Sequence, residues 1–191
     1  IVRFLKYNKM KTIKSKKRQK EAKKFLPEFV YGGTDGAITT FAVVAGAIGA
    51  SLSSTIIIIL GFANLLADGF SMAASNYLSS ESQREIASKH FLRFHAGKKP
   101  IESAVATFIS FGIMGFVPLL PFILATFYSP IIQNQFLYSA ILTALAFLLV
   151  GGFRGIIANK HPLKSAIETI CVGSFASLLA FTAGYLLQNI F

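Results

Sequence analysis

The stretch Gly61–Ser80, GFANLLADGFSMAASNYLSS, decides how the chain folds. Asp68 is its only charged residue, and polar or sulfur-bearing side chains recur at every fourth position around it. Residues four apart lie on the same side of a helix. The spacing therefore predicts one ridge of oxygen and sulfur ligands along a helix, formed by Asn64, Asp68, Met72, Asn76 and Ser80.

A second ridge beside the first carries only small side chains, and we call it the small ridge: Ala63, Ala67, Ser71, Ser75 and Ser79. Small residues on a membrane helix let another backbone approach closely, and the repeat Gly32-x-x-x-Gly36 in the first apolar run has the same property. Either set is a candidate for a close contact between helices. We interpret the segment Gly61–Ser80 as a membrane helix that lines a metal-ion path.

The composition of the whole chain is that of a membrane protein. Of its 191 residues, 53% are hydrophobic and 14% are charged, whereas a typical soluble domain has roughly 25% charged residues. Several apolar runs exceed the roughly 20 residues that a helix needs to cross a bilayer. No charged residue occurs from Ser103 to Phe153. These features exclude a soluble globular protein and predict an all-α integral membrane protein.

The apolar runs predict five transmembrane helices, at about 29–50, 54–78, 103–127, 135–158 and 166–188. They divide the chain into a basic cytoplasmic tail, 1–27, and a transmembrane domain, 28–191, whose cytoplasmic linker is 79–102. All 19 Lys and Arg residues fall in the tail, in the linker or in 154–164. Five spans place these segments on one side of the membrane, as the positive-inside rule requires. The N-terminus is therefore expected in the cytoplasm and the C-terminus on the opposite side.

The tail holds 11 of the 19 Lys and Arg residues and accounts for most of the net charge of +11. No nucleic-acid motif or aromatic pattern interleaves with these charges. We expect the tail to lie against anionic lipid headgroups and not to bind nucleic acid. The lone Cys171 cannot form an internal disulfide and is expected to be a packing residue.

Carboxylates also occur in the first span. Asp35 lies inside it and Glu28 seven residues earlier, so both are expected to face the same way. An ionised side chain at mid-bilayer costs roughly 2.5–3.5 kcal/mol on insertion scales, so such residues indicate an ion path. A thioether beside carboxylates favours a transition metal over magnesium or calcium. The candidate path residues are therefore Asp35, Asp68, Met72 and Asn64.

Two other functions use the same residues differently. An intramembrane aspartyl protease would share one proton between Asp35 and Asp68 to activate water, but the chain has no Tyr-Asp pair and no Gly-x-Gly-Asp motif. A structural membrane protein would leave both aspartates unexplained. The residues thus favour a transporter that is not an enzyme.

The runs at 32–50, 59–83 and 159–187 resemble the vacuolar iron transporter family: GGTDGAITTFAVVAGAIGA, ILGFANLLADGFSMAASNYLSSESQ and NKHPLKSAIETICVGSFASLLAFTAGYLL. The likeness covers about residues 25–190. It implies a five-span protomer, a homodimer with the path between its subunits, and proton-coupled export of ferrous or manganous ion from the cytosol. It implies no cofactor, the metal being cargo, and a multi-pass protein of a bacterial inner membrane or a vacuolar-type organelle membrane.

The resemblance also assigns residues. By motif position Glu28, Asp35 and Met72 match residues that line the family's path. Asn64 and Asn76 stand where some or many relatives carry glutamate. The linker, 79–102, is shorter than the metal-binding domain that iron transporters of plants and apicomplexans have at this place. The chain therefore resembles the shorter, nodulin-like or bacterial members.

Overall fold

The computed structural model describes residues 2–89 and 99–190, and within these ranges the regular elements are helices alone. The α-helices are α1 (Val2–Gly49), α2 (Ser54–Lys89), α3 (Pro100–Phe116), α4 (Leu120–Phe127), α5 (Gln135–Ile157) and α6 (Pro162–Gln188). Two 3₁₀ helices, η1 (Val117–Leu119) and η2 (Ser129–Asn134), flank α4. The predicted all-α fold is confirmed.

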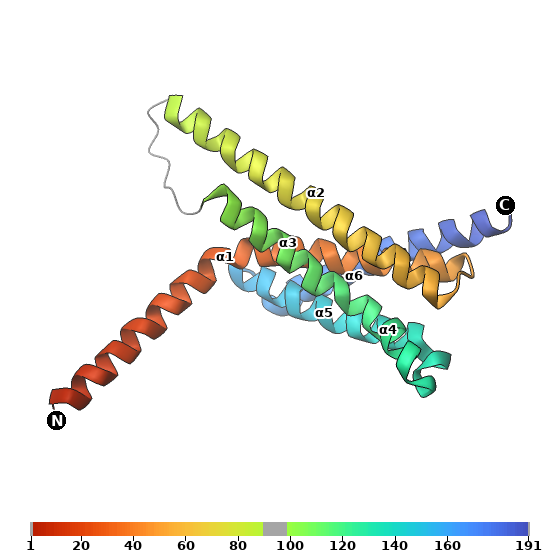
Figure 1. Ribbon diagram of the computed structural model, residues 1–191, viewed down its shortest axis with the longest axis horizontal. Coiled ribbons are helices and arrows are strands. Elements are labelled where there is room, and N and C mark those ends of the chain that lie inside the picture. The colour runs from red at the N-terminus through yellow and green to blue at the C-terminus, as the bar shows by residue number, and fades with distance from the viewer. Residues whose placement is uncertain (1, 90–98, 191) are drawn as a thin grey trace.

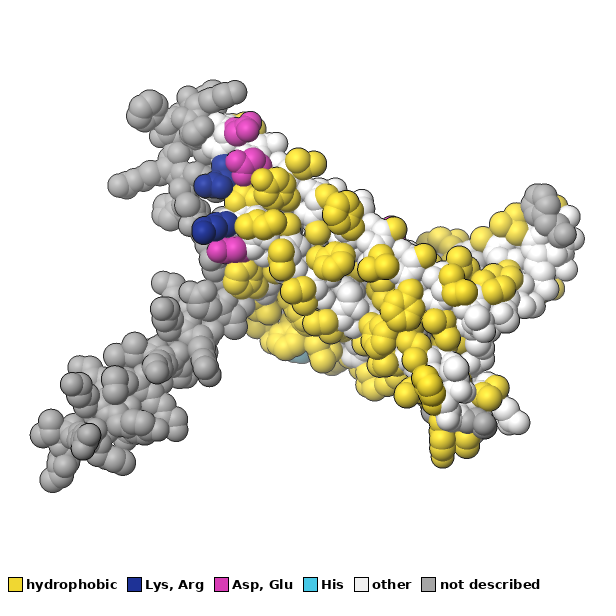
Figure 2. All heavy atoms as spheres, viewed as in Figure 1, with side chains coloured by type: hydrophobic (Ala, Val, Ile, Leu, Met, Phe, Trp, Pro, Cys, Tyr) yellow, Lys and Arg dark blue, Asp and Glu magenta, His cyan; other side chains and the backbone are white. Residues whose placement is uncertain are grey.

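Four segments of the described chain are long and apolar enough to cross a membrane: Ser54–Ile86, Pro100–Phe127, Ile132–Ile157 and Pro162–Gln188. They correspond to the second, third, fourth and fifth predicted spans. Figure 2 shows hydrophobic side chains over most of the visible face, with acidic and basic side chains gathered at one end. The protein is therefore a multi-pass membrane protein.

The first predicted span, 29–50, lies in α1 and is not one of these four segments. Asp35 and five glycines lower the mean hydropathy of this stretch. This part of α1 is nevertheless central to the bundle, since α1 packs along both α3 and α6. The five-span count and the orientation in the membrane stay predictions.

Prolines interrupt the helices at two places. Pro27 lies inside α1, where its ring removes a backbone hydrogen bond, and Figure 1 shows α1 changing direction between its red and orange parts. The sequence also predicts a kink at Pro118 and Pro121. It is confirmed, because α3 ends at Phe116 and the chain passes through η1 into α4.

α1 and α3 run parallel and touch at every fourth residue. A Cβ atom on Gly32 would lie 2.6 Å from the carbonyl oxygen of Thr107, and one on Gly36 would overlap the carbonyl oxygen of Phe111. Only glycine fits so close to another backbone. The repeat Gly32-x-x-x-Gly36 therefore serves a contact within one subunit.

The predicted cytoplasmic ends of several helices lie together. Pro27 of α1 and Arg154 of α5 line one cavity, and Glu28 contacts Ser103 at the start of α3. α2 lies beside α3 and continues to Lys89, well past its predicted span (Figure 1). The middle of the predicted linker, 90–98, lies outside the described residues.

Labelling of single cysteines tests the orientation. Cys171 is exposed and not the packing residue expected from the sequence, so it is first replaced by serine. A cysteine at the exposed Gln83 should then react with a membrane-impermeant reagent only from the cytoplasmic side, and one at the exposed Asn134 only from the other. Reaction of both from the same side would refute the five-span arrangement.

The glycine contact between α1 and α3 makes a separate prediction. Gly36→Leu should destabilise the single subunit by roughly 1–3 kcal/mol or more, because overpacking forces the two backbones apart. Thermal unfolding in detergent measures this effect. Gly112→Leu in α3 is the matched control, since a Cβ atom there meets nothing within 4 Å. Equal melting temperatures of the two variants would contradict the close contact.

Candidate metal-ion path

The ligand ridge predicted on α2 lies at the edge of the bundle. Its members are all half-buried, namely Asn64, Asp68, Met72, Asn76 and Ser80. Leu65 and Gly69 on one side of the ridge are buried, whereas every member of the small ridge on the other side is exposed. The ligand ridge thus lies between the buried face of α2 and its exposed face.

Glu28, Met72 and Asn76 line one cavity of ≈ 460 Å³, which we call the polar cavity. It lies between α1, α2 and the start of α3. Its other lining residues are mostly hydroxyl and amide side chains: Tyr31, Ser75, Ser79, Ser80, Gln83 and Ser103. Carboxylate, amide and hydroxyl oxygens with one thioether form a ligand set suited to a divalent transition metal.

Glu28 is the most buried of the predicted path acids. It is 7% exposed, whereas Asp35 and Asp68 are half-buried. The hydroxyl of Ser103 donates a hydrogen bond to its Oε1 atom. α3 therefore fixes the Glu28 carboxylate at the wall of the polar cavity.

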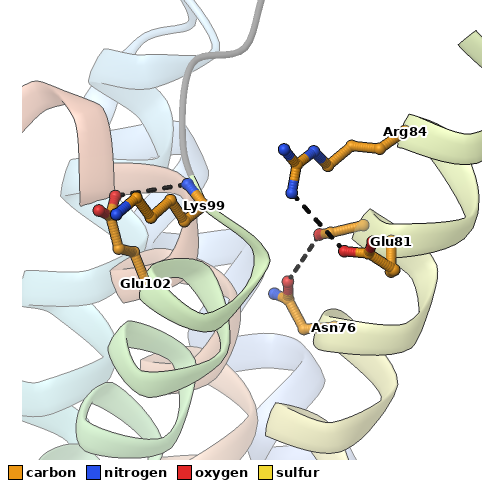
Figure 3. Close-up of polar contacts among 6 residues, drawn as sticks. Asn76, Glu81, Arg84, Lys99 and Glu102 are labelled. Carbon is orange, nitrogen blue, oxygen red and sulfur yellow. Dashed lines mark hydrogen bonds and ion pairs between the residues drawn. The ribbon is translucent and has the colours of Figure 1, made fainter. Parts of the chain in front are cut away.

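Asn76 joins α2 to α3. Its Nδ2 atom donates to Oγ1 of Thr107 at 2.9 Å, and the hydroxyl of Ser80 lies 3.4 Å from its Oδ1 atom, to which it donates. Charged groups lie nearby on both helices (Figure 3). On α2, Glu81 and Arg84 form an ion pair of 3.7 Å. At the start of α3, Glu102 accepts a hydrogen bond from the backbone N–H of Lys99, the residue before the helix. Asn76 is thus held by α3, close to these charged groups.

Asp35 lines a different cavity, of ≈ 450 Å³, between α1 and α5. The walls are largely apolar apart from Arg154, which lies 3.7 Å from Glu168 of α6. Glu28 and Asp35 were expected to face the same way. The structure instead places them at two cavities, and Tyr31 lines both. Glu28 faces α2 and α3, whereas Asp35, two turns further along α1, faces α5.

Asp68 and Asn64 complete the ridge toward the opposite end of α2. Asn64 donates to Oγ1 of Thr40 on α1 at 3.4 Å. No three His, Cys, Asp or Glu side chains among those described come together as a metal centre. A single subunit presents its ligands in a line and not as a closed cage.

The sequence did not predict the buried hydroxyls of Ser103 and Thr107, which hold Glu28 and Asn76. The only signal for them is their spacing of four in an otherwise apolar span. Such hydroxyls commonly bond the carbonyl four residues back in their own helix. Their contacts with α1 and α2 follow from packing that the sequence alone does not give.

Comparison with known proteins gives consistent matches. Residues 26–94 and 88–185 match the VIT family. The chain is 24% identical to vacuolar iron transporter 1 of Eucalyptus grandis and 25% identical to that of Arabidopsis thaliana, each alignment covering 85% of this chain and 86% of the relative. A vacuolar iron transporter of Plasmodium falciparum is 45% identical over 60 residues, which are 31% of this chain and 22% of the relative.

The plant relatives carry residues that this chain lacks. The two plant alignments extend over 218 residues, more than the 191 of the whole chain, so the relatives carry additional residues within the aligned region. The two family matches meet at 88–94, inside the linker. Both observations agree with a linker shorter than in those relatives.

Proposed function

Because the chain belongs to the VIT family, we propose that it carries divalent transition-metal ions out of the cytosol. The names of the relatives, vacuolar iron transporters, support metal-ion transport. The observation that carries the proposal is that Glu28, Met72 and Asn76 line one cavity. A thioether beside oxygen ligands favours ferrous ion as the cargo, with manganese as a second one.

A transporter accounts for the acids better than a protease does. An aspartyl protease needs two carboxylates around one water molecule, and Glu28 and Met72 would have no part in that reaction. The relatives that the chain matches are named as transporters. The chain is therefore not an enzyme, and the metal ion is its cargo.

The path is proposed to lie between two copies of the chain. Asp35 and Asp68 are only half-buried in one copy, and a charge facing lipid costs roughly 2.5–3.5 kcal/mol on insertion scales. Beside Asp68, the small ridge of α2 is exposed along its whole length and would admit a second backbone. A second copy covering this face would enclose four aspartates around one axis.

Proton antiport follows from the same carboxylates. An aspartate in a medium of low dielectric binds a proton or a metal ion but holds both poorly. A proton that enters from the far side would therefore release the metal there. A proton gradient across the membrane would then drive export.

Asp35→Asn tests the path. The substitution keeps size and hydrogen bonding but removes the charge for which metal and proton compete. Ferrous uptake into sealed vesicles under an imposed pH gradient should fall about tenfold or more, since a contact to a charged group is worth roughly 1.5–3 kcal/mol. Glu85→Gln, which removes an exposed acid of α2 outside both path cavities, should transport normally. A wild-type rate and pH dependence for Asp35→Asn would place the path elsewhere.

Cross-linking tests the dimer. In the Cys171→Ser background, a cysteine at Ser71 of the small ridge should form a disulfide between two copies in the membrane. A cysteine at Val172, which is also exposed but lies on α6, is the control and should not. Cross-linking through Val172 alone would move the interface to α6.

A further inference from the structure

We propose that Thr107 of α3 is a positioning residue, which turns the amide of Asn76 so that its oxygen faces the polar cavity. The inference rests on the proposed function, because it gives Asn76 the role of an oxygen ligand to the transported metal. It adds a third helix to a path that the sequence predicts on the first two spans alone.

The hydrogen bonds of Thr107 determine which atom of Asn76 it can meet. Thr107 is fully buried, and its hydroxyl donates its one proton to the carbonyl oxygen of Ser103 at 3.0 Å. The Oγ1 atom can then only accept a hydrogen bond from another group. In a side-chain amide only the nitrogen can donate one, and Nδ2 of Asn76 lies 2.9 Å away.

The amide oxygen is thereby left on the side of the cavity. Asn76 and Ser80 both line the polar cavity, and the Ser80 hydroxyl donates to Oδ1 of Asn76. In Figure 3 the nitrogen of Asn76 points toward α3, and its oxygen points along α2 toward the end of the helix that carries Glu81. Divalent metals bind the carbonyl oxygen of an amide and not its NH₂ group. The reversed amide would present two N–H donors to an arriving cation.

The backbone of Thr107 is itself held in place. Its carbonyl oxygen lies where a Cβ atom on Gly32 would come within 2.6 Å. α1 thus presses directly on α3 at the residue that bonds Asn76. The neighbouring hydroxyl, Ser103, holds Glu28 by a hydrogen bond of its own. Two residues of α3, four apart, therefore orient one ligand from α1 and one from α2.

Thr107→Val tests the proposal, because it keeps the shape of the side chain but removes the acceptor. With the amide free to turn, the KM for manganese should rise about three- to tenfold, the effect of one hydrogen bond, while the maximal rate changes little. Thr107→Ser should restore the wild-type KM. Thr143→Val in α5 is the matched control, since Thr143 is equally buried and bonds the carbonyl of Ser139 in the same way at 2.7 Å. Its KM should stay at the wild-type value.

A second background separates positioning from packing. A carboxylate presents oxygen whichever way it turns, so in an Asn76→Asp background Thr107→Val should raise the KM less than about twofold further. A purely structural role for Thr107 predicts the same loss in both backgrounds. Should Thr107→Val fail to fold, Thr107→Ala removes the same hydroxyl oxygen without placing a methyl group where it was.

Equilibrium binding of manganese to the purified protein, followed by electron paramagnetic resonance, repeats the comparison without transport. A wild-type Kd and KM for Thr107→Val, or equal losses in both backgrounds, would overturn the positioning role while leaving metal transport intact. If the wild-type protein moves no metal into vesicles, the proposed function fails. The Kd comparison still decides whether Thr107 orients a metal ligand.

Discussion

The close approach of α1 to α3 is the constraint on which the rest of the structure depends. Gly32 and Gly36 place one helix backbone directly against the other, in a contact that a single Cβ atom would prevent. Because the two helices run parallel, the same four-residue register continues from Gly32 to Glu28, which meets Ser103. The contact thus fixes the wall of the polar cavity as well as the core of the bundle. Glycine weakens a helix in isolation, but in a membrane it permits the van der Waals packing that hydrophobic burial cannot provide there.

A second constraint is the free energy of charges in the membrane. The charge of Glu28 is stabilised within the subunit, since its carboxylate is buried and accepts a hydrogen bond from Ser103. Asp35 and Asp68 are not satisfied in this way, since both stay half-exposed. A lone subunit in lipid would leave them facing hydrocarbon or would protonate them. The proposed second copy resolves this conflict, and the exposed small ridge beside Asp68 leaves room for it.

Much of this architecture is predictable from local patterns, and the part that is not depends on packing. Apolar length alone predicts the four clear spans, and Pro118 with Pro121 predicts the break after α3. The spacing of four places Met72 and Asn76 on one ridge because a helix repeats regularly. No spacing rule tells which helix lies opposite that ridge. For this reason the role of Thr107 was not predicted, and the glycines of α1 gave no sign that they face α3 and not a second subunit.

The amide at position 76 explains why a positioning residue is needed at all. A carboxylate at this position would present oxygen in every rotation about its last bond. An amide avoids placing a second carboxylate in the cavity that already holds the buried Glu28. It presents oxygen in only one of its two orientations, however, so the neutral ligand requires a neighbour that selects this orientation. Thr107 can do so only because its own proton is already bonded to Ser103. A neutral ligand at position 76 and a buried hydroxyl at position 107 are therefore two parts of one arrangement, which lowers the charge of the path while keeping its oxygen ligands.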